Sequence, residues 1–240
     1  MAECQFITHE IVRGDTLYRL AQKYRTTVPL ILLANPGVDP YNLQVGTRLR
    51  ICRGNQVVQR PSMDEMQMAG DLGKLWMQYS NWLKLYLESL SQSAARQREV
   101  AQRVEQAAGK IVDVFALFYP DAMVTKLRDA FVRQYTLSLL SLANAVNNRD
   151  TMAQEQFGER VEEYAEMVAA LLSQYNRNYN KDDLEEKLEQ SPEVAERIVL
   201  ALRNGDSMAE FSGFEQLDDW AADLGVVLAE GLQKEFYREG

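Results

Sequence analysis

The chain has 240 residues, of which 46% are hydrophobic and 25% are charged, a balance typical of a folded globular protein rather than a disordered one. Its formal net charge is −9, and no apolar run approaches the roughly 18 residues that a membrane span requires. The acidic balance argues against a nucleic-acid partner, because phosphates would be repelled. The start of the chain lacks a basic segment followed by an apolar one, so we expect no signal peptide and synthesis in the cytoplasm.

The charge is unevenly distributed along the chain. Residues 1–54 carry seven Lys/Arg and four Asp/Glu, a net charge of +3, whereas residues 55–240 carry nineteen and thirty-one, a net charge of −12. This asymmetry predicts two units with different surfaces. We expect a small module at residues 1–53, a polar linker with Gly and Pro at 54–63, and an α-helical bundle at 64–240.

The N-terminal residues predict a strand, two helices and a second strand. The first strand is expected at 9–12, and Gly14 breaks it because glycine takes the positive φ of a tight turn. Asp15 or Thr16 then caps a helix. Its apolar face is formed by Leu17, Leu20, Ala21 and Tyr24.

The second helix begins near Thr27, with Pro29 in its first turn and Asn35-Pro36-Gly37 ending it, and the last strand follows at 48–52. We expect its buried side to contain Leu30, Ile31, Leu33 and Ala34. The expected module core consists of Val12, Leu20, Ala21, Leu33 and Ile51. Pairing of the two strands would bring the loop at 14–16 next to the loop at 35–37.

The single histidine and the two cysteines all lie in this module. His9 on the first strand is expected to be a surface or cross-strand residue rather than a ligand. Cys4 and Cys52 lie at its two ends and are either two free thiols or a disulfide that closes the module. The sequence leaves both readings open.

Two motifs in the module resemble a known family. They are Val12-x-Gly14-Asp15-Thr16-Leu17-Tyr18-x-Leu20-Ala21 and Asn35-Pro36-x-x-Asp39-Pro40-x-x-Leu43-x-Val45-Gly46, and together they look like the LysM module. The resemblance implies binding of glycans that contain N-acetylglucosamine, chiefly peptidoglycan and chitin, in a groove between two loops. By this resemblance one wall contains Gly14, Asp15, Thr16 and Leu17, and the other contains Asn35, Pro36, Gly37, Val38 and Asp39. Loop amides would bond the acetamide, while Leu17, Pro36 and Val38 would meet apolar parts of the sugar.

From Asp64 onward the apolar residues recur with a helical period. We expect helices from about 64 to 90, from Val100 to Phe118, from Asp121 to Asn148 and from about 151 to 175. Two more follow, from Asp182 to Arg203 with an interruption at Ser191-Pro192, and after residue 206. The predicted fold class is therefore α+β: a small βααβ module followed by a larger all-α up-and-down bundle.

Two stretches of the bundle echo each other, at 142–152 and 200–208. They indicate either a duplicated helix–turn unit or a chance similarity of two helix ends.

The bundle contains no histidine and no cysteine, which removes the usual His-bearing metal sites and the Cys/His nucleophile pairs. We therefore predict no metal, no cofactor and no catalytic residue. The carboxylates of Glu162, Glu163 and Glu166 are expected to form a solvated helix face. The following aromatic residues have the spacing of a core: Trp76, Tyr79, Trp82, Tyr86, Tyr135 and Trp220.

The bundle also shows a looser resemblance. It rests on Leu75-Trp76, Phe118-Tyr119, Ala222-Asp223-Leu224, Ala229-Glu230-Gly231-Leu232 and Phe236. These points look like an uncharacterised helical-bundle family of spore-forming Firmicutes, whose members carry histidines inside several helices. The corresponding positions here are Tyr79, Tyr135 and Ser191, so the resemblance implies no metal role for this chain.

These observations predict a non-catalytic protein whose LysM module binds peptidoglycan or a chitin-type oligosaccharide and anchors the bundle. The implied location is the cytoplasm or mother cell, with the spore envelope or cell wall as destination, and other envelope proteins are candidate partners of the bundle. Two alternatives remain. The bundle is a carboxylate-dependent enzyme targeted by the module, or the protein is a protein–protein adaptor.

Overall fold

A computed structural model describes residues 5–24, 26, 28–38, 43–53 and 62–236. The chain divides into two compact units, Met1–Asp64 with Val112–Thr125, and Glu65–Ile111 with Lys126–Gly240. Residues 54–61 of the expected linker lie outside the described residues. The N-terminal module and the helical bundle are each described by themselves below.

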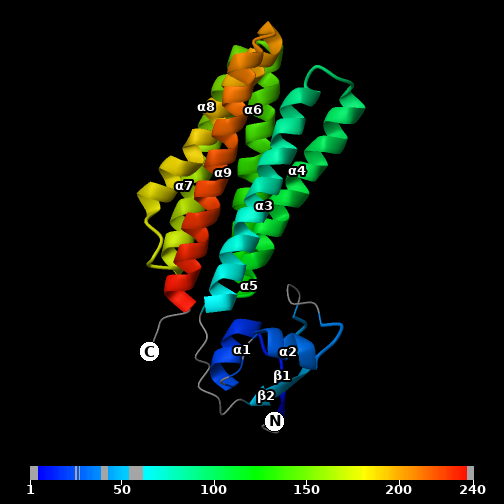
Figure 1. The fold of residues 1–240 in the computed structure, drawn as a ribbon, viewed down its shortest axis with the longest axis vertical. Coiled ribbons are helices and arrows are strands. Elements are labelled where there is room, and N and C mark those ends of the chain that lie inside the picture. Colours follow the sequence, from blue (N-terminus) through cyan, green and yellow to red (C-terminus); the bar gives the residue numbers. More distant parts are fainter. Residues whose placement is uncertain (1–4, 25, 27, 39–42, 54–61, 237–240) are drawn as a thin grey trace. The chain divides into compact units, whose positions relative to one another are not determined.

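The module has two antiparallel strands and two short helices (Figure 1). Strand β1 (Gln5–Glu10) pairs with β2 (Arg48–Arg53), and α1 (Leu17–Tyr24) and α2 (Val28–Ala34) lie between them in the sequence. Both helices pack against the sheet through one apolar cluster. Its buried members are Ile11, Leu17, Leu20, Ala21, Ile31, Leu49 and Ile51. Two short strands are marginal on their own, so this cluster holds the module together.

Several details of the predicted module are wrong. The first strand begins at Gln5 rather than at position 9, because β2 offers backbone partners as far as Arg53. Val12 is exposed in the turn after β1, so it does not join the core. Leu30 is 45% exposed, so it does not lie on the buried side of α2 as expected. Leu33 is 80% exposed. It lies two residues from the buried Ile31, which places it on the opposite side of α2.

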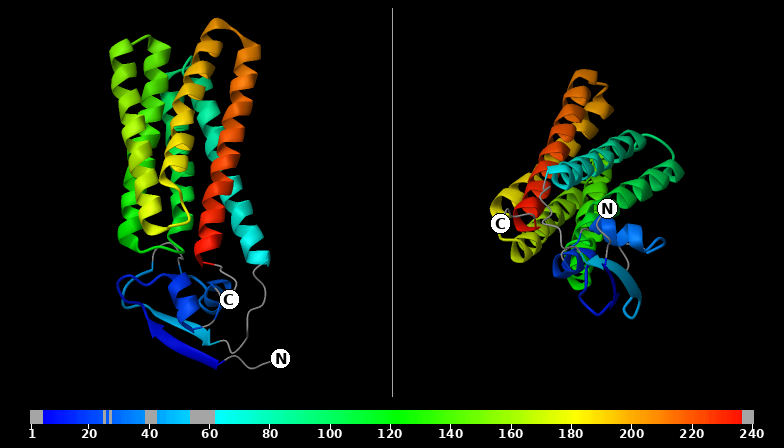
Figure 2. Two further views of the ribbon diagram at one scale, coloured as in Figure 1. Left: turned by 90° about the vertical axis from the view of Figure 1, so that its left-hand side faces the viewer. Right: turned by 60° about the horizontal axis from the view of Figure 1, so that its bottom comes forward.

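The longest helices of the bundle run side by side (Figure 2). The bounds of its helices are α3 (Ser62–Ser89), α4 (Ala94–Phe115), α5 (Asp121–Leu127), a π-helix η1 (Arg128–Thr136), α6 (Leu137–Asn148), α7 (Thr151–Tyr175), α8 (Lys181–Asn204) and α9 (Ser207–Phe236). Of these, α5, η1 and α6 follow one another directly along the chain. Consecutive helices from α6 to α9 pack on one another, as an up-and-down connection requires. This confirms the predicted α+β class. In the described part of the chain, no helix is both long and apolar enough to cross a bilayer.

Two predicted helices have different ends in the structure. The second helix of the bundle begins at Ala94 rather than at Val100, and it ends at Phe115 rather than at Phe118. The predicted continuous α-helix at 121–148 is interrupted by η1, a stretch of π-helix. Within η1 the Thr136 hydroxyl donates to the carbonyl of Phe131, five residues earlier, at 2.9 Å. Sequence periodicity does not reveal such a segment, because its apolar residues also recur every three or four positions.

The predicted interruption of α8 at Ser191-Pro192 is also wrong, because the helix continues through Pro192. Proline has no N–H, so the carbonyl of Leu188, four residues earlier, loses its partner within the helix. The Tyr135 hydroxyl, which comes from η1, donates to this carbonyl at 2.6 Å. A side chain from another helix therefore replaces the missing backbone donor.

The two echoing stretches form the same turn. Arg149 after α6 has φ 59° and Gly205 after α8 has φ 67°, so both helices end on a left-handed residue. Asp150 then caps α7 by accepting from the Ala153 N–H, and Asp206 precedes α9 and accepts from the Ala209 N–H in the same way. The similarity in sequence is thus matched by a shared geometry, although either duplication or chance would produce it.

Candidate functional site

The first loop of the module is a tight turn between β1 and α1. The Asp15 N–H donates to the Val12 carbonyl at 3.0 Å, and Gly14 has φ +92°, the positive value that its position predicts. The helix cap is Thr16, whose hydroxyl accepts from the Arg19 N–H at 3.2 Å. Asp15, the other candidate for the cap, turns inward instead.

Asp15 takes part in a chain of side-chain hydrogen bonds. Its Oδ2 accepts from the Val12 N–H at 2.9 Å and lies 2.7 Å from Nε2 of His9. Nδ1 of His9 lies 2.8 Å from the Tyr24 hydroxyl. Burial by itself would raise the pKa of Asp15, but the bonds from His9 and Val12 outweigh it and the pKa is lowered.

His9 is not a surface residue, because only 9% of it is exposed. Of the two expected positions, surface and cross-strand, the surface one is therefore wrong, whereas His9 does lie opposite Leu49 of β2. The surface position was expected because a polar residue on a short strand usually faces water. The partners that bury His9 lie six and fifteen residues away, so the local sequence does not indicate them.

The second loop follows α2 and is fixed by Asn35. The amide nitrogen of Asn35 donates to the carbonyls of Ile31 and Arg50 at 2.6 and 2.7 Å, and its oxygen accepts from the Arg50 N–H at 2.8 Å. The side chain thus pairs with the free edge of β2 as a neighbouring strand would. The Val38 N–H donates to the Asn35 carbonyl at 3.2 Å, and Gly37 between them has φ +94°.

The expected glycan-contacting residues differ in how far they can reach a ligand. Pro36 and Gly37 are exposed, while Gly14, Asp15, Asn35 and Val38 are half-buried. Thr16 and Leu17 are buried, and Leu17 belongs to the apolar cluster, so its side chain supports the fold. Asp39 lies outside the described residues, as does Cys4. Both expectations for Cys4 and Cys52, two free thiols or a disulfide, therefore stay predictions.

Tyr79, Tyr135 and Ser191, the positions where the loosely resembling family carries histidines, form a buried polar centre in the bundle. Tyr135 and Ser191 lie with their oxygens 2.6 Å apart, and the Tyr79 hydroxyl lies 3.3 Å from that of Thr136. Burial raises the pKa of Tyr79 and of Tyr135 well above the usual range, so both phenols stay protonated. Trp76 and Trp220 pack around this centre, as predicted for core aromatics, and Phe131 lies beside them. Trp82 is only half-buried and lies under the Arg103 guanidinium, 5.9 Å from the ring centre.

The carboxylates predicted to form a solvated helix face lie on α7. Glu162, Glu163 and Glu166 are exposed. Lys181 bridges two carboxylates, with its Nζ 2.9 Å from Glu166 and 3.0 Å from Glu185. Among the residues that the structure describes, no three His, Cys, Asp or Glu side chains gather as a metal site would require.

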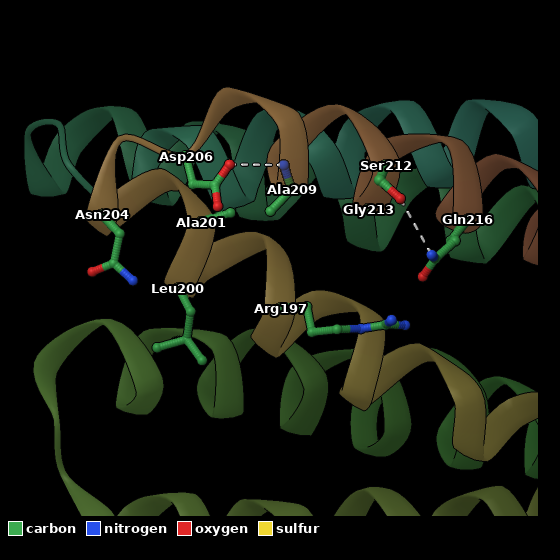
Figure 3. Close-up of a pocket in the computed structure, with 9 residues that line it drawn as sticks. All are labelled: Arg197, Leu200, Ala201, Asn204, Asp206, Ala209, Ser212, Gly213 and Gln216. Atoms are coloured by element: carbon green, nitrogen blue, oxygen red, sulfur yellow. Dashed lines mark hydrogen bonds between the residues drawn. The ribbon is translucent and has the colours of Figure 1, made fainter.

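An open pocket of about 290 Å³ lies between the end of α8 and the start of α9 (Figure 3). It is lined by Arg197, Leu200, Ala201, Asn204, Asp206, Ala209, Ser212, Gly213 and Gln216. Gly213 lets the two helices approach closely, because a Cβ there would lie 2.5 Å from the Ile198 side chain. The one carboxylate that lines the pocket is that of Asp206, and it caps α9. These groups are those of a helix hairpin and do not define a ligand class.

Comparison with known proteins identifies the module. The family model of the LysM domain matches residues 9–51, which confirms the resemblance seen in the sequence. A LysM domain is a non-catalytic domain that binds N-acetylglucosamine-containing glycans, peptidoglycan among them. No curated protein and no solved structure matches the chain. The resemblance of the bundle to the spore-former family therefore stays a prediction.

Proposed function

We propose that the LysM domain binds peptidoglycan or a chitin-type oligosaccharide and anchors the helical bundle to that polymer. The observation that carries the proposal is the family match over residues 9–51, which spans both loops and the core of the module. On one side, the expected glycan-binding groove of the LysM domain contains Gly14, Asp15, Thr16 and Leu17. Asn35, Pro36, Gly37, Val38 and Asp39 form the other side.

The contacts within the module refine how these residues would act. Because the side chains of Asp15 and Asn35 are engaged inside the module, the polar contacts to an acetamide would come from loop N–H and C=O groups. Pro36 and Val38 would supply the apolar surface under the sugar ring. A single shallow site of this kind binds weakly, so a polymer with many repeats is its natural ligand.

The location proposed with this function is the bacterial cell wall or the spore envelope. It is supported by the glycan class of the domain, and the spore assignment rests on the predicted resemblance of the bundle. In this proposal the LysM domain anchors the bundle, and the bundle binds other envelope proteins. In the described residues no specific observation favours a carboxylate-dependent enzyme.

Sedimentation of the intact chain with insoluble peptidoglycan and with chitin tests the proposal. We expect Pro36→Gln to weaken binding by about fivefold, because it removes apolar contact at the exposed loop. Leu33→Gln is the matched control, since Leu33 is exposed on α2 outside the expected groove and this change also adds no charge. Failure of the parent protein to bind either polymer would refute the proposal. Equal effects of the two variants would refute the assignment of the groove.

A further inference from the structure

We propose that His9 is the positioning residue of the glycan site, which it holds in shape through Asp15 while Tyr24 orients its ring. This inference rests on the proposed function and adds a residue that the expected groove does not include. The three residues come from β1, the first loop and the last turn of α1. They therefore join the wall-forming loop to both of the elements that flank it.

The direction of the bond between His9 and Asp15 follows from the chemistry of the carboxylate. The carboxylate of Asp15 can only accept, so Nε2 of His9 must carry a proton and donate to it. With a proton on Nε2, Nδ1 accepts from the Tyr24 hydroxyl when the ring is neutral and donates to it when the ring is protonated. The rings of His9 and Tyr24 also lie in contact, with centroids 5.5 Å apart. Every polar atom of the imidazole thus has a partner inside the module.

His9 and Tyr24 act on the loop through Asp15, and Nη1 of Arg19 also donates to the Gly14 carbonyl of the same turn, at 3.2 Å. Oδ2 of Asp15 accepts from both His9 and the Val12 N–H, so it fixes the two ends of the turn at 12–15. Without His9, the carboxylate would lose its charge-assisted partner while remaining mostly buried, with 15% of the side chain exposed. The loop would then rotate to hydrate it, and the N–H and C=O groups of Gly14 and Thr16 would leave their places.

Positioning can be separated from simple stabilisation with three variants of the full-length chain. His9→Gln keeps the pattern, because an amide N–H can donate to Asp15 and an amide oxygen can accept from Tyr24. His9→Leu fills the space without either bond. Tyr24→Phe removes one oxygen only. Thr8→Val, on the same strand with an exposed side chain, is the control.

The experiment measures the affinity of each protein for a β-1,4-linked N-acetylglucosamine tetramer by calorimetry, together with its melting temperature. We expect His9→Leu to weaken binding at least about tenfold at a temperature where it is folded, and His9→Gln to restore it to within about threefold. Tyr24→Phe should lie between them, and Thr8→Val should match the parent. A residue that only stabilises the module would lower the melting temperature and leave the affinity of the folded protein unchanged.

The possible results separate this inference from the proposed function. A parent protein that does not bind the tetramer or the polymers refutes the proposed function. A parent that binds, with a His9→Leu variant that binds equally well, overturns the role of His9. If His9→Leu does not fold, Tyr24→Phe decides, because unchanged affinity in that variant overturns the proposal and weakened affinity supports it. A His9→Gln variant that folds but binds as poorly as His9→Leu also overturns it.

Discussion

Replacement of Tyr135 by Phe tests how the bundle accommodates a proline inside α8. The phenol donates to the Leu188 carbonyl at 2.6 Å, and that carbonyl has no intrahelical donor because residue 192 is proline. The same oxygen lies 2.6 Å from the Ser191 hydroxyl, which donates to it because the phenol proton is already used. Tyr135 and Ser191 are both fully buried, so water cannot replace the lost oxygen.

The expected loss is about 2 kcal/mol of unfolding free energy, since each buried polar group left without a partner costs about 1–3 kcal/mol. Urea unfolding followed by tryptophan fluorescence measures it. The signal reports the bundle, because all three tryptophans, Trp76, Trp82 and Trp220, are in helices of the bundle. The change should shift the midpoint and leave the denaturant slope as it is.

Two further variants make the test specific. Tyr79→Phe is the matched control, because its hydroxyl lies 3.3 Å from a Thr136 hydroxyl that already donates to a carbonyl, and we expect less than about 1 kcal/mol. Pro192→Ala in the Tyr135→Phe background returns an N–H to the helix, so it should recover at least half of the loss. The reasoning is refuted if Tyr135→Phe costs no more than Tyr79→Phe, or if Pro192→Ala recovers nothing.

Four other perturbations have expected outcomes. Asn35→Ala should lower the stability of the module by about 1–3 kcal/mol, seen as faster amide exchange of Arg50 at the edge of β2, and parent-like exchange would contradict it. Arg149→Gly should raise the bundle's stability by up to about 1 kcal/mol, because φ 59° disfavours a side chain. Gly205→Ala should lower it by about the same amount, and urea midpoints that move in the same direction would refute this account. The pKa of Asp15 is lowered in the folded protein from 3.8, so its stabilisation is complete above that value and is lost as the pH falls below it. Calorimetric melts of the parent and Asp15→Asn should therefore diverge above about pH 4 and converge in acid.

Local sequence determined much of the N-terminal module. Gly14 and Gly37 occupy positive φ as their turns require, and Thr16 caps α1 through its own hydroxyl. The helices of the bundle follow from an apolar period of three to four residues, and the turns after α6 and α8 lie where polar residues and glycine interrupt that period. These features depend on residues only a few positions apart, so one amino-acid sequence is enough to predict them.

Tertiary structure alone decided the rest. The sequence places His9 on a strand, but only the fold brings Asp15 and Tyr24 to its two nitrogens. Likewise, Pro192 by itself predicts a broken helix, and only the approach of Tyr135 from η1 keeps α8 continuous. In both cases a buried polar group needs a partner that is distant in sequence, and local propensity contains no information about which residue will supply it.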